Sequence, residues 1–204
     1  WREAASLTFQ RVAPSGALVG AKLTVLGAIG GPNPQLLWLG TGWAVVWMGP
    51  DGNLNYGRLN PDGSVAVAAT PLTTIFTPLS PVNDFSAVWS GSFLGVAWAE
   101  LLGSDPPGRD LYFTVLNLDG TKAFPEITAV SGGLFADAAP RLYFAGGRFH
   151  LVHLHGNVSG LREIEIETNG TIMPGQRFWA NRGGSSAVAW NGATLAILWP
   201  QLRD

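Results

Sequence analysis

A ten-residue pattern that occurs four times along the chain limits, more than any other feature, what the chain can fold into. Each copy has an aromatic residue, a glycine two positions later and, at its tenth position, a second aromatic residue or a histidine. The copies cover residues 38–47, 89–98, 144–153 and 190–199. The glycine supplies the positive φ that a tight turn needs, so each copy predicts a β-hairpin.

A second pattern has a leucine followed nine positions later by a glycine. It covers residues 7–16, 54–63, 111–120 and 161–170. The copies end in Ser-Gly, Asp-Gly, Asp-Gly and Asn-Gly, which favour a two-residue hairpin turn, and polar and apolar residues alternate along 162–166 with the period of a strand. A further strand is expected after each turn, over 17–26, 64–70, 121–130 and 171–179. Each repeat therefore predicts four short antiparallel strands, called A to D below.

The spacing of the turn glycines indicates a whole number of repeats. Gly16, Gly63, Gly120 and Gly170 are separated by 47, 57 and 50 residues, and the count from the last glycine through the chain ends to the first is again 50. The chain ends therefore cut one repeat in two. Its strands A and B come from residues 185–199, and its strands C and D come from residues 7–26.

A repeat of about 50 residues with four strands is typical of a β-propeller blade. The sequence thus predicts an all-β fold, a single four-bladed β-propeller of four-stranded antiparallel blades over residues 1–204. Sharing one blade between the chain ends removes the open sheet edge. The blades are expected at 185–204 plus 1–30, 31–78, 79–133 and 134–184. An eight-bladed ring made by two chains is the alternative. The monomer is favoured because a chain of this length can bury about 70% of its unfolded surface.

The composition excludes several classes of function. Only 13% of the residues are charged and the net charge is −2, so the chain lacks the basic surface of a nucleic-acid-binding protein. Cysteine is absent, which excludes structural disulfides, thiolate metal sites and cysteine nucleophiles.

No membrane-spanning or targeting segment is predicted. Residues 23–50 are uncharged, but Gly and Pro within 30–34 and 40–42 would break a helix in lipid. The N-terminus lacks the basic region and apolar stretch of a signal peptide. Because the chain begins with Trp1, we expect that it was processed or belongs to a longer protein.

Residues 36–64 resemble a repeat of bacterial secreted and surface proteins. In that repeat a Trp-x-Gly hairpin and a second Trp precede a polar loop and an Arg-Leu-x-x-x-Gly strand end, here Arg58, Leu59 and Gly63. The layout is also similar, more distantly, to the four-bladed hemopexin-type propeller. The resemblance implies a β-propeller that is secreted, periplasmic or at the cell surface and that serves as a binding or scaffold module.

Residues explained by the repeat are expected to serve folding, and departures from it are candidates for function. The tryptophans that fit the repeat are expected to be buried between blades; they are Trp38, Trp43, Trp47, Trp89, Trp98, Trp190 and Trp199.

Two long connections are candidate recognition surfaces, since long loops on a propeller face commonly bind ligands. The first is the B–C loop 99–110, with Glu100, Asp105, Arg109 and Asp110. The second is the junction of the chain ends, with Trp1, Arg203 and Asp204. A tolerated insertion is the alternative.

A third candidate is Trp179, which lies outside the repeat between Arg177 and Arg182. An aromatic ring flanked by two guanidinium groups suits a sugar or an anionic group. The favoured interpretation is structural: Trp179 packs where blades 4 and 1 meet.

A metal site is the fourth candidate. His153 and His155 are two apart on a predicted strand and project from one face, with Asp137 or a neighbouring blade as the source of a third ligand. The favoured interpretation is structural: His153 fills a tryptophan position and His155 lies in the B–C loop. The carboxylates of Glu163, Glu165 and Glu167 share one strand face, which we interpret as solvated.

The first functional hypothesis is a non-catalytic binding or scaffold module that presents loops to a protein or a glycan, without nucleic acid, membrane insertion or a required cofactor. The alternative is a propeller with a small-molecule or metal site near its axial channel or at His153 and His155. A hydrolase or lyase comes third, because the sequence contains no GxSxG, P-loop or strand-associated GxGxxG motif.

Overall fold

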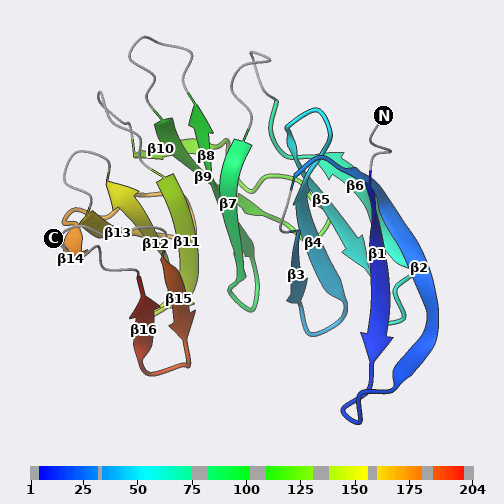
Figure 1. Cartoon of the computed structure of the whole chain (residues 1–204). Coiled ribbons are helices and arrows are strands. Elements are labelled where there is room, and N and C mark those ends of the chain that lie inside the picture. The colour runs from blue at the N-terminus through cyan, green and yellow to red at the C-terminus, as the bar shows by residue number, and fades with distance from the viewer. Residues whose placement is uncertain are drawn as a thin grey trace, which may run out of the picture. The chain divides into compact units, whose positions relative to one another are not determined.

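The structure is a computed structural model that describes residues 5–31, 34–74, 82–101, 109–130, 138–155, 160–180 and 186–199 (Figure 1). All regular elements in these ranges are strands, so the all-β class is confirmed. Within the same ranges, no helix is long and apolar enough to cross a membrane.

The strands follow one another along the chain with the turns that the sequence predicts. They are β1 (Ala5–Val12), β2 (Leu18–Ile29), β3 (Gln35–Trp38), β4 (Trp43–Met48), β5 (Leu54–Leu59), β6 (Val65–Pro71), β7 (Val82–Trp89), β8 (Leu94–Leu101), β9 (Arg109–Leu116), β10 (Ile127–Val130), β11 (Ala138–Ala145), β12 (Arg148–His155), β13 (Gly160–Ile166), β14 (Arg177–Ala180), β15 (Ala187–Trp190) and β16 (Leu195–Leu198).

Three sheets have four antiparallel strands in chain order, β3–β6, β7–β10 and β11–β14. They are the predicted A-to-D units of blades 2, 3 and 4. The β1–β2 and β15–β16 pairs form two separate two-stranded sheets. These pairs are the predicted strands C–D and A–B of blade 1. A four-stranded blade 1 and a closed propeller therefore stay predictions.

The two types of turn differ in geometry. The A–B glycines Gly40, Gly91, Gly146 and Gly192 all have positive φ, as predicted. The C–D turns are one residue longer than predicted. The amide of Asn60 donates to the carbonyl of Ser64, which leaves three residues in the loop, with Gly63 at a positive φ. This is a type I turn followed by a left-handed glycine, and the same closing bond occurs at Ala13–Ala17, Asn117–Thr121 and Glu167–Thr171.

The B–C register is the same in the three complete sheets. The first residue of strand B pairs with the residue four positions before the C–D turn glycine. The pairs are Trp43 with Leu59, Leu94 with Leu116, and Phe149 with Ile166. Residues at equal distances from these landmarks therefore occupy equivalent places in each blade.

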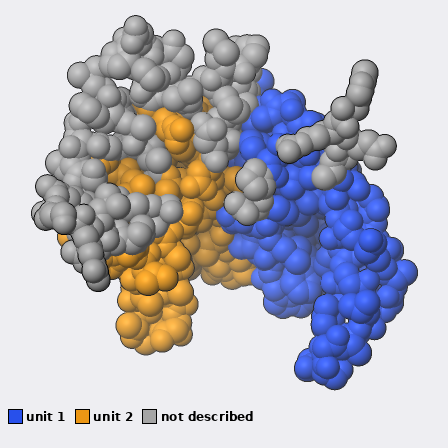
Figure 2. All heavy atoms as spheres, viewed as in Figure 1, with its two compact units in different colours: residues 1–75, 118–120 blue, residues 76–117, 121–204 orange. Residues whose placement is uncertain are grey.

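The chain divides into two compact units, residues 1–75 with 118–120 and residues 76–117 with 121–204 (Figure 2). In the first unit, the β1–β2 sheet packs on the β3–β6 sheet. The buried side chains at this contact are Leu7, Phe9, Val25, Leu26, Val45, Trp47 and Leu59.

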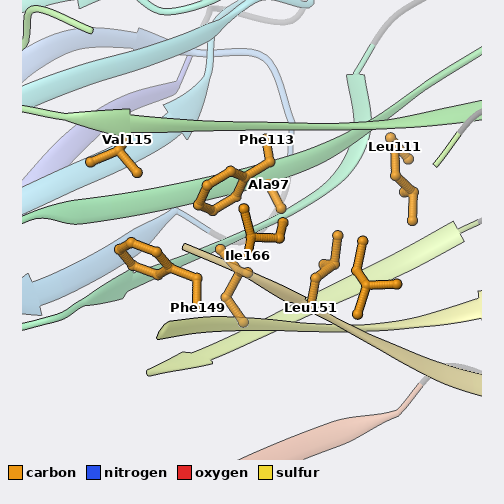
Figure 3. Packing of buried hydrophobic residues seen from close by; sticks show 10 residues of the cluster. Ala97, Leu111, Phe113, Val115, Phe149, Leu151 and Ile166 are labelled. Carbon is orange, nitrogen blue, oxygen red and sulfur yellow. The ribbon is translucent and has the colours of Figure 1, made fainter. Parts of the chain in front are cut away.

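In the second unit, an apolar core lies between the β7–β10 and β11–β14 sheets (Figure 3). Phe113 on β9 meets Phe149 on β12 with ring centroids 5.3 Å apart. On the other face of the β11–β14 sheet, a smaller core joins Val152 and Leu161 to side chains of β15 and β16. This second contact positions the candidate site.

The prediction that all seven repeat tryptophans are buried is confirmed for two of them. Trp47 and Trp98 are fully buried, Trp43 and Trp89 are half-buried, and Trp38, Trp190 and Trp199 are exposed. Trp190 and Trp199 accompany the β15–β16 sheet, which has two strands where the complete sheets have four and so provides less cover. Trp38 lies at the end of its hairpin, against Trp43.

Candidate functional site

One position of the repeat has a carboxylate where the other three copies have an aromatic ring. Seven residues before the turn glycine, three copies have Phe9, Tyr56 and Phe113, all buried. The fourth copy has Glu163, whose residue is 1% exposed. The predicted solvated face is therefore wrong at Glu163. A buried carboxylate is costly unless partners compensate it, which makes this position the first place to search for a site.

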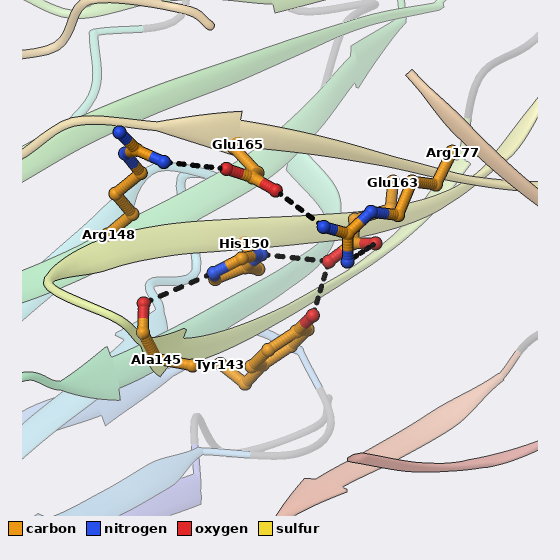
Figure 4. Close-up of polar contacts among 7 residues, drawn as sticks. All are labelled: Tyr143, Ala145, Arg148, His150, Glu163, Glu165 and Arg177. Carbon is orange, nitrogen blue, oxygen red and sulfur yellow. Dashed lines mark hydrogen bonds and ion pairs between the residues drawn. The ribbon is translucent and has the colours of Figure 1, made fainter. Parts of the chain in front are cut away.

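The Glu163 carboxylate is surrounded by three partners from three other strands (Figure 4). Its Oε1 atom accepts a hydrogen bond from the Tyr143 hydroxyl on β11 and lies 2.8 Å from Nδ1 of His150 on β12. Its Oε2 atom makes no hydrogen bond but lies 3.6 Å from an Nη atom of Arg177 on β14. The carboxylate is thus compensated by hydrogen bonds and by positive charge.

Glu165 extends this cluster along the same face of β13. Its two carboxylate oxygens accept one hydrogen bond each, at 3.1 Å, from Arg148 and from Arg177. The result is a row of alternating charges, Arg148–Glu165–Arg177–Glu163, visible in Figure 4. Carboxylates on either side of Arg177 hold its guanidinium group in place.

The partners of Glu163 also depart from the repeat. At the position of His150 the β3–β6 and β7–β10 sheets have Ala44 and Gly95, and at the position of Tyr143 they have Leu37 and Val88. In those two sheets a large aromatic side chain on the third strand accompanies a small residue on the second. The β11–β14 sheet has the smaller side chain on the third strand and the larger one on the second, so the polar cluster fills a similar volume with different chemistry.

The hydrogen bonds of His150 determine where its protons lie. Nε2 is 3.2 Å from the carbonyl oxygen of Ala145, which can only accept, so Nε2 carries a proton. Nδ1 lies 2.8 Å from the Glu163 carboxylate. Burial acts to raise the pKa of Glu163, but the hydrogen bonds of His150 and Tyr143 and the charges of His150 and Arg177 bring that pKa below its ordinary value. Glu163 is therefore ionised.

Two hollows adjoin the cluster. The first, of about 480 Å³, is lined by Tyr143, Ala145, Gly146, Arg148, His150, Glu165, Arg177, Trp179, Trp190 and Leu195. The second, of about 360 Å³, shares Arg148, Glu165 and Arg177 with the first and is also lined by Glu163. Two arginines and two exposed tryptophans around one hollow can bind a polar ring through hydrogen bonds and stacking.

The structure brings together two of the residues that the sequence predicts as ligand contacts. Arg177 and Trp179 both lie on β14 and line the first hollow. Arg182 lies outside the described residues. The sequence reasoning missed Tyr143, Arg148 and His150 as members of the site. Comparison of the four repeat copies, position by position, would have found Glu163 and its two oversized neighbours.

Both ends of the predicted loop 99–110 belong to strands. Glu100 belongs to β8 and pairs with Asp110 on β9, where Arg109 also lies. Trp98 donates a hydrogen bond of 2.8 Å to Glu100, and burial raises the pKa of that carboxyl group. These residues line neither hollow. Asp105, Trp1, Arg203 and Asp204 lie outside the described residues.

The predicted metal pair lies on β12, so His155 belongs to a strand and not to the B–C loop. His153 is fully buried, and the two rings lie edge to face with centroids 6.3 Å apart. Among the described residues, no three histidine, aspartate or glutamate side chains form a group that could hold a metal ion. Asp137, the suggested third ligand, lies outside the described residues.

Comparisons with protein families, curated proteins and solved structures find no match to the chain. The resemblance of residues 36–64 to a surface-protein repeat therefore stays a prediction.

Proposed function

We propose that the chain is a non-catalytic binding module, built as a four-bladed β-propeller, that holds a glycan in the hollow beside Trp179. The closed ring and the binding site rest on separate observations. The resemblance of residues 36–64 supports a location at the cell surface, in the periplasm or outside the cell.

The closed ring is supported by apolar side chains exposed at positions that are core elsewhere in the repeat. Val12 is 59% exposed, whereas its equivalents in the complete blades have an exposed fraction of 0%; these are Leu59, Leu116 and Ile166. Leu198 is 75% exposed, whereas its equivalents also have 0%; these are Val46, Ala97 and Val152. Strands C and D for β15–β16, and strands A and B for β1–β2, would bury both side chains.

The repeat also fixes the register of the proposed shared blade. By the B–C rule of the complete sheets, Leu195 pairs with Val12, four residues before Gly16. Ala196 then pairs with Arg11, and β16 runs antiparallel to β1.

A cross-strand disulfide tests this register, because the chain has no cysteine of its own. Paired residues on neighbouring antiparallel strands have Cα atoms about 5 Å apart, which a disulfide can bridge. The variant Ala196→Cys with Arg11→Cys should oxidise to a single intramolecular cross-link, seen as a faster band at monomer mass in a non-reducing gel. The matched control, Ala196→Cys with Gln10→Cys, puts the two thiols on opposite faces of the sheet.

The outcomes separate the two ring models. A cross-link at monomer mass in the first variant, and little in the control, supports the closed monomer. A cross-link at dimer mass would replace it with the eight-bladed ring of two chains. Equal cross-linking of both variants, or none, would contradict the shared blade.

The observation that carries the binding function is the convergence of Arg148, Arg177, Trp179 and Trp190 on one hollow. Exposed aromatic rings stack on sugar rings, and guanidinium groups hydrogen-bond to their oxygens. A glycan array probed with the wild-type chain should give hits that Trp179→Ala removes. Phe178→Ala is the matched control, because Phe178 is the next residue of β14, is similarly exposed and lines neither hollow. An array without hits, or hits that survive Trp179→Ala, would contradict this function.

A further inference from the structure

The first hollow carries an excess of positive charge although the chain is net acidic. Two arginines line it, Arg148 and Arg177, against the single carboxylate of Glu165. The side chain of Arg177 is 61% exposed, and a guanidinium group has five N–H donors. The bonds to Glu163 and Glu165 therefore leave donors of Arg177 for a ligand.

Glu165 fixes the two arginines relative to each other. One of its oxygens binds Arg148 and the other binds Arg177, both at 3.1 Å. A free arginine loses much rotamer entropy when it binds an anion, and a carboxylate that already holds it lowers that loss. The two guanidinium groups are thus arranged in advance for one anionic group.

A further observation indicates a sugar and not a bare anion. Trp179 and Trp190 are both exposed and both line the hollow, which gives flat apolar surface for a ring.

Resting on the proposed glycan function, we propose that the ligand is an acidic sugar. Its carboxylate lies between Arg148 and Arg177, and its ring lies against Trp179.

The test compares two oligosaccharides of equal length that differ in charge. Tetragalacturonate and a neutral galactose tetrasaccharide are titrated into the full chain, and binding is followed by calorimetry and tryptophan fluorescence. We expect tetragalacturonate to bind at least about tenfold more tightly, since charge-assisted hydrogen bonds are the stronger ones. Arg177→Gln should lower the affinity for tetragalacturonate by roughly tenfold or more. Arg177→Lys should lower it by less, because lysine keeps the positive charge but cannot donate two parallel hydrogen bonds to a carboxylate.

Arg162→Gln is the matched control. Arg162 lies on β13, bonds to Gln176 and lines neither hollow, so its loss should leave tetragalacturonate affinity unchanged. Circular dichroism spectra of each variant establish that the fold is retained. Inorganic phosphate serves as a competitor that has charge but no ring.

Each outcome bears on a different claim. Equal binding of the two oligosaccharides would overturn the acidic ligand and leave the glycan function standing. Absence of binding by either oligosaccharide, together with an empty glycan array, would overturn both. Displacement of tetragalacturonate by equimolar phosphate would show that binding is unspecific charge attraction and would reject the proposal. Equal losses of tetragalacturonate affinity in Arg177→Gln and Arg162→Gln would reject it as well.

Discussion

Nδ1 of His150 lies 2.8 Å from Oε1 of Glu163 in the interior of the β11–β14 sheet. The other ring nitrogen, Nε2, lies 3.2 Å from the Ala145 carbonyl oxygen, so the Glu163 carboxylate belongs to a buried polar pair. Such a pair stabilises little compared with apolar packing, but removal of one partner leaves the other charge buried and uncompensated. This asymmetry makes the pair testable by single substitutions.

Glu163→Gln should destabilise the protein strongly. The substitution keeps the size of the side chain but leaves His150 and Arg177 without their negative partner, and the expected loss is about 3 kcal/mol in the free energy of unfolding. Urea unfolding followed by tryptophan fluorescence measures it. Glu167→Gln, four residues further along and outside β13, should change that free energy by less than about 0.5 kcal/mol. Similar losses in the two variants would contradict the cluster.

Replacing the pair by the equivalent residues of the β7–β10 sheet should recover stability. Glu163→Phe alone places a larger side chain against His150, and His150→Gly alone removes one of the two hydrogen-bonding partners of the carboxylate. The double variant reproduces Phe113 beside Gly95, the arrangement of the β7–β10 sheet. We expect it to be more stable than the sum of the single losses predicts, with a coupling energy above about 1 kcal/mol. Additive losses would show that size compensation plays no part.

The contribution of Glu163 should disappear in acid. Its pKa is lower in the folded chain than in the unfolded chain, so the unfolded chain binds the proton first as the pH falls. The stabilisation is complete above the ordinary glutamate pKa of about 4.3 and is lost as the pH falls through the folded value. Urea midpoints of wild type and Glu163→Gln, measured from neutral pH downwards, should converge. A constant difference would contradict the lowered pKa.

The tyrosines predict a loss of stability in alkali. The pKa values of Tyr56, Tyr112 and Tyr143 are all raised, chiefly by burial, and at Tyr143 also by its hydrogen bond to Glu163. These are all the tyrosines of the chain. The unfolded chain therefore releases phenolic protons first, at about pH 10, and stability falls as the pH rises above that value. Absorbance at the phenolate band should rise later in the native protein than in urea. Coincident titrations would contradict this.

Gly95→Ala should disturb the core of the second unit. A Cβ atom at Gly95 would lie 2.5 Å from the Phe149 ring, and Gly95 has no positive φ that would add strain of its own. Overpacking of this kind costs about 1–3 kcal/mol, measured as the shift in free energy of unfolding. Adding Phe149→Leu removes the clashing ring atoms and should recover part of the loss. A double variant less stable than Gly95→Ala would contradict the contact.

Much of the fold is readable from the sequence because its signals are local. A few neighbouring residues determine the positive φ of Gly40 or Gly63 and the alternation of polar and apolar residues along 162–166. The turns and strands of each repeat copy can therefore be predicted from that copy alone. The length of the C–D turns was predicted one residue short. Asp-Gly and Asn-Gly occur both in two-residue turns and in the three-residue turn found here.

The candidate site depends on contacts between residues that are far apart in the sequence. The departure of Trp179 from the repeat predicts it and Arg177 as candidates, whereas the row of like charges at Glu163, Glu165 and Glu167 predicts a solvated face. Its partners Tyr143, His150 and Arg177 come from three different strands, and only their assembly compensates the buried carboxylate.

The sequence by itself determined the strands, the turns and their A-to-D order, because backbone preferences and side-chain alternation act within about ten residues. The tertiary structure alone decided which carboxylate is buried, which tryptophans stay exposed and which arginines share one hollow. Those outcomes depend on which sheet packs over each residue. A two-stranded sheet covers less of its neighbours than a four-stranded sheet does, so more of their side chains stay exposed.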